Sequence, residues 1–246
     1  MMMDSQVSAI PVRTVARIGG LLYLTIIALG LFQELFVRSP LIVPRDAAIT
    51  AANIASMELL WRLGIAAEIL LLSCATALTL IFLILLSPVS RNLTWLAVFF
   101  NLIAIAVEAS AALDLLRALY PLSGAGYLQA FDATQLHALT RLATRSHAHG
   151  FGVALIFFGF CTLVLGLLIY RSGYLPRILG VMMAIAGICY LTNSFALIIV
   201  PAVADRLFPA ILLPAFVAEL SLALWLLLKG VDMERWRLRA SSEGWP

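Results

Sequence analysis

Five acidic side chains stand inside long apolar stretches of this sequence: Glu34, Glu68, Glu108, Asp114 and Glu219. They are conspicuous because only 12% of the 246 residues are charged and 63% are hydrophobic. An isolated charge at the centre of a bilayer costs about 2.5–3.5 kcal/mol on insertion scales. Each carboxyl group must therefore be neutral, paired with another group, or directed into a polar cavity. Carboxyl groups in such places are candidates for binding a proton, a cation or a small polar molecule.

The apolar stretches that carry these residues are long enough to cross a membrane. The mean hydropathy is +1.05, and about 20 apolar residues span the hydrocarbon layer. Six stretches meet this length: 16–37, 60–86, 93–118, 147–170, 175–199 and 208–229. They leave no room for a separate soluble domain, so we expect one polytopic membrane domain over residues 1–246. The sequence predicts an all-α integral membrane protein, a six-transmembrane-helix bundle with short helical segments in its outer loops.

Basic residues predict the orientation of this bundle. The side with both termini and the short second and fourth loops carries Arg13, Arg17, Arg91, Arg171, Arg177, Lys229, Arg235, Arg237 and Arg239. Basic residues in short loops and flanks favour the cytoplasmic side, which predicts an N-in/C-in topology. The net charge of +3 is explained by basic flanks facing anionic lipid. The expected partner is therefore the lipid bilayer and no nucleic acid, and the oligomeric state is not indicated.

Two acidic residues in the outer loops are placed as helix caps. Asp46 precedes Ala47 at an N-cap position, which predicts a short helix that is either separate from the second span or runs into it. Asp132 stands three residues before Gln135 and resembles a capping box. The helix that follows Asp132 either lies along the outer membrane surface or continues the fourth span.

Three glycines recur at intervals of seven in the fourth span. Gly152, Gly159 and Gly166 fall on one stripe of a helix, where small residues let a neighbouring helix approach closely. This pattern predicts helix packing and no chemistry.

The depth of the acidic residues suggests a cavity. With a rise of about 1.5 Å per residue, Glu219 lies near the midplane, Glu108 roughly 3 Å outward and Glu68 roughly 7 Å outward. Asn193 comes out roughly 9 Å outward, and Glu34 and Asp114 roughly 12 Å. The expected cavity opens to the outside and is lined by Glu68, Glu108, Glu219, Asn193 and His149. Its expected mouth carries Arg38, Asp46, Asn53 and Arg62.

Some of these charges have local partners in the sequence. Glu34 and Arg38, Glu58 and Arg62, and Asp114 and Arg117 are three or four residues apart, which predicts interfacial ion pairs on single helices. Glu68, Glu108 and Glu219 have no such neighbour. If ionised, they need a partner from another helix, and Arg62, His149 or Asn193 could supply it. If neutral, they would only hydrogen-bond neighbouring helices, a form that burial favours.

The histidines leave a metal site open as an alternative. His147 and His149 point about 200° apart on a helix, so both cannot bind one metal there. We expect His149 to lean toward the glycine stripe and His147 to point away. A zinc site formed by His149 with Glu68 or Glu34 is geometrically feasible. The sequence has no zinc-protease, hydrolase or nucleotide-binding motif, and its three cysteines fit no metal spacing, so no cofactor is expected.

Three segments resemble a known family. They are Ala16–Leu24, Phe36–Ala48 with Arg62-Leu63-Gly64 downstream, and His149–Gly180, in which Ser172-Gly173-Tyr174-Leu175-Pro176-Arg177-Ile178-Leu179-Gly180 is the most specific run. Together they are similar to the bacterial integral membrane family of domain of unknown function 4386, over residues 14–230. The resemblance implies a multi-pass protein of the bacterial cytoplasmic (inner) membrane and no agreed activity.

Three functions are consistent with these features. The first two are a non-catalytic membrane component and an outward-facing protein that binds or transports a small polar ligand or cation. The alternative is an intramembrane metal-assisted enzyme that uses His149 and Glu68, although no catalytic residue can be assigned from the sequence.

Overall fold

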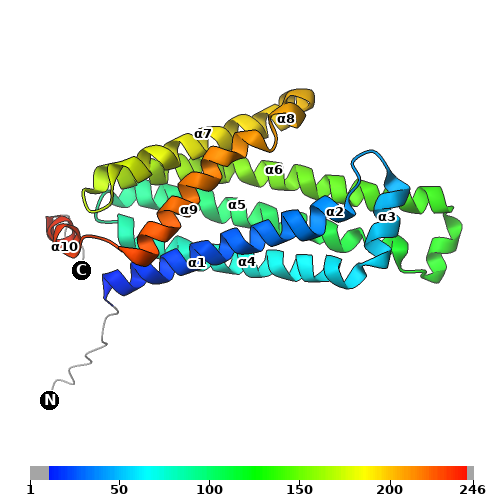
Figure 1. The fold of residues 1–246 in the computed structure, drawn as a ribbon, viewed down its shortest axis with the longest axis horizontal. Coiled ribbons are helices and arrows are strands. Elements are labelled where there is room, and N and C mark those ends of the chain that lie inside the picture. The colour runs from blue at the N-terminus through cyan, green and yellow to red at the C-terminus, as the bar shows by residue number, and fades with distance from the viewer. Residues whose placement is uncertain (1–10, 243–246) are drawn as a thin grey trace, which may run out of the picture.

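Six long apolar helices form the body of the protein, as the sequence predicts. The computed structural model describes residues 11–242, and over that range it contains helices and no strand (Figure 1). The helices long and apolar enough to cross a membrane are α1 (Val12–Phe32) with its extensions, α4 (Glu58–Leu86), α5 (Arg91–Arg117), α6 (Ala133–Ser172), α7 (Arg177–Ile199) and α9 (Leu213–Leu228) with the short turn before it. The extensions of α1 are a π-helical turn, η1 (Gln33–Arg38), and α2 (Ser39–Leu41). The protein is an all-α integral membrane protein.

Shorter elements close the two ends of the bundle. At one end lie α3 (Ala47–Ser56), the 3-10 turns η2 (Tyr120–Leu122) and η3 (Gly126–Ala130), and the start of α6. Further short elements, α8 (Pro201–Leu207) and η4 (Ala210–Leu212), join α7 to α9. At the opposite end lies α10 (Met233–Ser242). We call these ends the α3 side and the α10 side.

Both predicted helix caps are present on the α3 side. Asp46 Oδ1 accepts a hydrogen bond from the Ile49 amide at 2.8 Å. Asp132 and Gln135 form a reciprocal capping box with two bonds of 2.9 Å. Met57 has a non-helical backbone conformation that interrupts the helix, so α3 is separate from α4.

The helix that starts after Asp132 is a continuation of the fourth span. Helix α6 has 40 residues without interruption, which is about 60 Å. The hydrocarbon layer is about 30 Å thick, so the first part of α6 extends beyond it on the α3 side.

Glycines bring α6 and α7 into backbone contact, as the stripe predicts. A Cβ added to Gly166 would lie 2.7 Å from the Gly180 carbonyl oxygen, and one added to Gly180 would lie 2.5 Å from the Tyr170 nitrogen. A Cβ at Gly159 would lie 3.2 Å from the Gly187 oxygen. The glycines of α7 therefore face those of α6, and each allows the other helix to approach.

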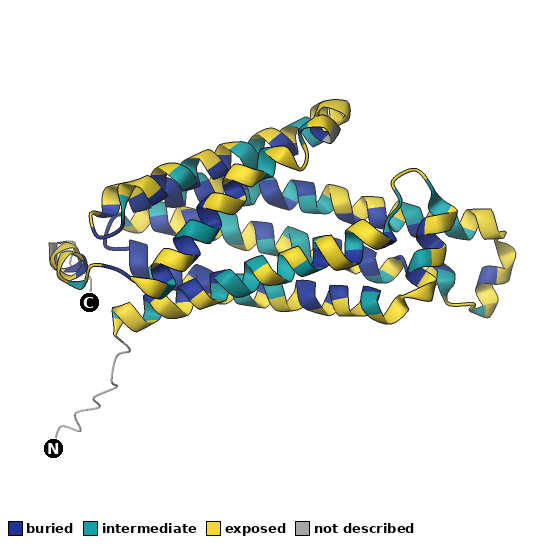
Figure 2. Cartoon of the chain, viewed as in Figure 1, coloured by how far each residue is buried: buried dark blue, intermediate teal, exposed yellow. Residues whose placement is uncertain are grey.

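An apolar core fills the bundle toward the α10 side. Its fully buried members include Leu85, Leu168, Met183 and Leu226. The exposed large apolar side chains lie on the outside of the long helices, where lipid would contact them (Figure 2). The Tyr174 hydroxyl and the Trp236 indole both donate to the Leu85 carbonyl oxygen, at 2.6 and 3.1 Å. These contacts attach α10 and the α6–α7 loop to the end of α4.

Candidate functional site

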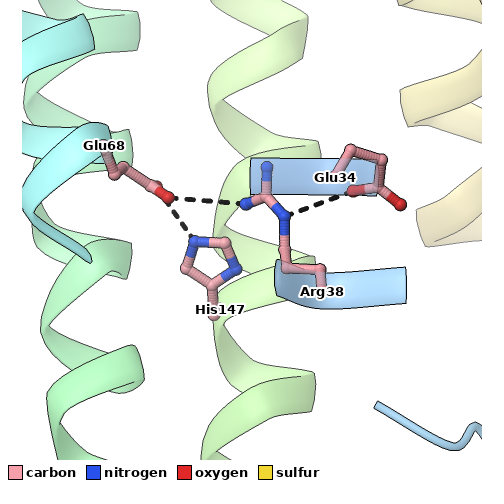
Figure 3. Close-up of polar contacts among 4 residues, drawn as sticks. All are labelled: Glu34, Arg38, Glu68 and His147. Carbon is pink, nitrogen blue, oxygen red and sulfur yellow. Dashed lines mark hydrogen bonds and ion pairs between the residues drawn. The ribbon is translucent and has the colours of Figure 1, made fainter. Parts of the chain in front are cut away.

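A buried carboxyl group joins three helices in the half of the bundle nearer the α3 side. Glu68 on α4 is 1% exposed. Its Oε1 lies 3.0 Å from His147 Nε2 on α6, and its Oε2 accepts a hydrogen bond from Arg38 NH1 of η1 at 3.4 Å (Figure 3). Arg38 Nε also donates to Glu34 Oε2 at 3.2 Å. We call Gln33, Glu34, Arg38, Glu68 and His147 the Glu68 cluster.

The π-helical turn η1 supplies three of these five side chains. Pro40 follows it closely, and a proline ring clashes with the carbonyl of the residue four positions earlier in a regular helix. That residue is Phe36, so the widened turn relieves this clash. Single π-helical turns are frequent at functional sites. Here the turn places the Arg38 guanidinium between Glu34 and Glu68.

Gln33 completes the surroundings of Glu68. Its side chain is 3% exposed. With the amide oriented so that both of its atoms find partners, the nitrogen donates to Glu68 Oε2 at 2.7 Å. The oxygen accepts from the Glu68 backbone nitrogen at 3.2 Å. Glu68 thus has partners from two helices besides its own.

The charges of the cluster do not balance when His147 is neutral. Two carboxylates, Glu34 and Glu68, then face one guanidinium, that of Arg38. Glu34 is half exposed, with 47% of its side chain accessible, and can be hydrated. Glu68 is buried away from bulk solvent, and an uncompensated buried charge is costly. A proton on His147 would bring the sum of the four charges to zero.

The cavity beside the cluster is small. It measures about 10 Å³ and is lined by Gln33, Val37, Arg38, Trp61, Gly64, Ile65, Glu68 and Leu115, which is room for about one water molecule. The Trp61 indole closes one wall by donating to the Leu115 carbonyl oxygen at 2.9 Å. The arrangement can hold a proton or a water molecule, and it has no room for an organic substrate.

Glu219 belongs to a second polar cluster nearer the middle of the bundle. Glu219 on α9 is nearly buried, and the Tyr190 hydroxyl of α7 donates to its Oε1 at 2.7 Å. Tyr23 of α1 is also buried and interacts with the same carboxyl group. Asn193, one turn from Tyr190, is buried, and its Oδ1 has no hydrogen-bond partner among the residues that the structure describes.

Glu108 lies between the two clusters. It is partly exposed, and no hydrogen bond joins its side chain to the described part of the chain. Its electrostatic neighbours are Glu68 and Arg38 on one side and Tyr190 on the other. The glutamates expected to line one cavity are therefore divided between two clusters, with Glu108 between them.

The two histidines are placed opposite to the expectation. His147 is 3% exposed and bound to Glu68, whereas His149 is exposed and its Nδ1 bonds the Arg145 carbonyl oxygen at 2.8 Å. The prediction that His149 faces inward was wrong because α6 has two buried faces. One carries the glycines and faces α7. The other carries Thr140, Thr144 and His147 at helical spacing, a signal that the glycine stripe concealed.

Most residues of the expected cavity mouth have structural contacts instead. Asp46 caps α3, and the Asn53 amide nitrogen donates to the Leu41 carbonyl oxygen at 3.4 Å. Arg62 pairs with Glu58 at 2.7 Å and does not reach the buried glutamates. Of the four residues expected at the mouth, only Arg38 contacts Glu68.

The three predicted local ion pairs are confirmed. Arg38 and Glu34 lie 3.2 Å apart, Arg62 and Glu58 2.7 Å, and Arg117 and Asp114 2.5 Å. Asp114 has a further partner, because the Ser146 hydroxyl donates to its Oδ2 at 2.6 Å.

The histidines and carboxyl groups do not gather into a metal site in the described part of the chain. No group of three or more His, Cys, Asp or Glu side chains that could hold a metal ion occurs among the residues whose side chains the structure describes. The suggested zinc pair of His149 and Glu68 is not brought together, since His147 occupies the place beside Glu68.

Comparison with known proteins gives a family without an assigned activity. A protein of Archaeoglobus fulgidus described as uncharacterized is 28% identical over 164 residues, which is 66% of this chain and 79% of that protein. No solved structure matches. The family model for a domain of unknown function, DUF4386, matches residues 18–230. The chain therefore belongs to the DUF4386 family of domains of unknown function.

Proposed function

We propose that this chain is a non-catalytic membrane protein that binds a proton at the Glu68 cluster from the α3 side of the membrane. The observation that carries the proposal is the buried Glu68 carboxyl group between Arg38 and His147. The cluster has one negative charge in excess when His147 is neutral, and histidine is the side chain whose charge changes most readily near neutral pH.

Charged groups near His147 and Glu68 come from η1, α4 and α5. Glu34 and Arg38 belong to η1, Glu68 to α4, and Glu108 and Asp114 to α5. Four of these five are carboxyl groups and one is a guanidinium, so the surroundings of the ring carry more acidic than basic groups. The half-exposed Glu34 offers the proton a route in from the α3 side.

The other half of the bundle offers no continuation of this route. No Asp or Glu follows Glu68 in α4 or Glu219 in α9, and the helix ends meet in the apolar core around Leu85 and Leu226. The arrangement supports binding or sensing of a proton in preference to its transport.

The distribution of arginines supports an orientation for this site. Because the short loops and flanks on the α10 side are basic, that side would be cytoplasmic. The α3 side would then face outward from a bacterial cytoplasmic membrane, and the cluster would respond to external pH.

A nuclear magnetic resonance titration tests the proposal directly. The chain has three histidines, so ring-¹⁵N-histidine labelling gives few signals, and His147→Gln identifies the one from the cluster. In lipid nanodiscs the His147 signal should move between the neutral and protonated positions over a pH range of about 4 to 9. In Glu68→Gln the same transition should shift along the pH axis.

Two results bear against the proposal. A His147 ring that stays in one protonation state across the range would show that the cluster only holds the helices together. If Glu68→Gln leaves the pH transition of the His147 signal unchanged, Glu68 is not part of the proton-binding site. Glu58→Gln is the matched control, because Glu58 pairs with an exposed arginine on the same side of the membrane and should not affect His147.

A further inference from the structure

A groove between α5 and α6 lies outside the Glu68 cluster. Its volume is about 720 Å³, and its walls come only from these two helices. Its polar residues include Asp114, Arg117, Arg145 and His149, and its apolar ones include Val107 and Val153.

The polar part of the groove has cationic groups in excess. Asp114 is its one acidic residue, and both carboxylate oxygens already have partners, Arg117 and Ser146. The Arg145 side chain makes no hydrogen bond or ion pair with the described residues. Arg141, one turn earlier on α6, lies within electrostatic range of Arg145. Like charges at this spacing are destabilising, and an anion in the groove would offset their repulsion.

Nitrogen donors in the groove remain open to such an anion. The Arg117 side chain is 58% exposed and uses NH1 for Asp114. The Arg145 guanidinium has no partner among the described residues, so its N–H groups are open as well. Arginine recognises phosphate through several N–H groups in a fixed plane.

The groove changes from charged to apolar along the membrane normal. Helix α5 runs toward the α3 side and α6 runs away from it (Figure 1). Val107 is therefore deeper in the membrane than Arg117, and Val153 is deeper than Arg145. Arg117 ends α5, so the charged part lies nearer the α3 end of the bundle and the apolar part nearer its middle.

We propose that this groove binds an anionic phospholipid. The phosphate lies against Arg117 and Arg145, and an acyl chain follows the apolar wall past Val107 and Val153. Charge complementarity selects the anionic headgroup. The change from charged to apolar lining selects a lipid over free phosphate, since a free phosphate would use only the outer part of the groove.

Native mass spectrometry of the full chain, released from detergent micelles with added lipid, tests this. Phosphatidylglycerol should remain bound as one molecule in preference to phosphatidylcholine, and inorganic phosphate at the same concentration should not displace it. Arg145→Gln should weaken phosphatidylglycerol binding by about fivefold, and Arg117→Gln with Arg145→Gln by more than about tenfold. Arg62→Gln removes an equal charge on the same side but outside the groove, and should leave binding unchanged.

The single variant Arg145→Gln tests lipid binding without a folding defect, because the Arg145 side chain has no described partner whose loss would unfold the chain. Equal weakening by Arg62→Gln, or equal retention of phosphatidylcholine, would overturn the proposal. Displacement of the lipid by inorganic phosphate would assign the site to free phosphate instead.

Discussion

Two carboxyl groups bind the same arginine in this protein and differ in burial. Glu34 and Glu68 both contact Arg38, but the Glu34 side chain is 47% exposed and the Glu68 side chain 1%. Exposed ion pairs contribute at most about 1 kcal/mol. Removing one partner of a buried pair is strongly destabilising, because it leaves the other charge buried without compensation.

We therefore expect Glu68→Ala to lower the free energy of unfolding by about 3–5 kcal/mol. Glu34→Ala should lower it by less than about 1 kcal/mol. Both can be measured by denaturant titration in mixed micelles at neutral pH. Equal losses in the two variants would mean that Arg38 is held by its own packing and not by Glu68.

The hydrogen bond between Tyr190 and Glu219 leads to a second, independent prediction. Hydrogen bonds between membrane helices contribute about 0.6–2 kcal/mol, and the Tyr190 hydroxyl lies 2.7 Å from Glu219 Oε1. In a double-mutant cycle of Tyr190→Phe and Glu219→Leu, the coupling free energy should fall in that range. Additive effects of the two substitutions would show that this hydrogen bond does not stabilise the bundle.

At the scale of single residues, the sequence predicts contacts within one helix and does not predict those between helices. Glu34 with Arg38 and Asp114 with Arg117 follow from spacing alone, because residues three or four apart share a helix face. Nothing in the spacing places Arg38 beside Glu68, 30 residues later, or His147 beside it, 79 residues later. The second contact of Arg38 depends on how three helices pack.

Among the elements, α6 and α7 are in backbone contact, and glycines permit it. A Cβ at Gly180 would meet the Tyr170 backbone nitrogen at 2.5 Å, and backbone cannot move aside as a side chain can. Gly30 offers a matched control in α1, since its Cβ would lie 3.8 Å from Leu71 Cδ1, an ordinary contact distance.

Gly180→Ala should therefore destabilise the protein by about 1–3 kcal/mol, the usual cost of overpacking. Gly30→Ala should be neutral or slightly stabilising, because alanine favours the helix over glycine by about 1 kcal/mol. Thermal unfolding of both variants in detergent checks the pair. A neutral Gly180→Ala would show that α6 and α7 can separate without loss.

The elements themselves follow from the sequence more completely than the site does. Hydropathy gives the six spans, and capping residues such as Asp46 and Asp132 give helix starts. The π-helical turn cannot be predicted in this way, because its residues fit a regular helix pattern and only Pro40 indicates a distortion. The site depends on that turn. The sequence therefore predicts the helices but does not predict the Glu68 cluster.

On the scale of the whole molecule, the two ends of the bundle differ in polarity. The Glu68 cluster and the groove between α5 and α6 lie toward the α3 side, whereas the α10 side is closed by apolar core and carries the basic helix α10. A proton sensor needs this asymmetry, because a site open to both sides would leak. The biological meaning of the cluster therefore depends on which side faces out.

Cysteine labelling of cells determines that orientation. In a background with Cys74, Cys161 and Cys189 replaced by alanine, Gln129→Cys places an exposed thiol on the α3 side and Glu234→Cys places one on the α10 side. Because basic flanks stay cytoplasmic, a membrane-impermeant maleimide should label residue 129 in intact cells and residue 234 only after permeabilisation. The reverse pattern would make the Glu68 cluster a sensor of cytoplasmic pH. Labelling of both residues in intact cells would contradict the three spans, α6, α7 and α9, that separate residue 129 from residue 234.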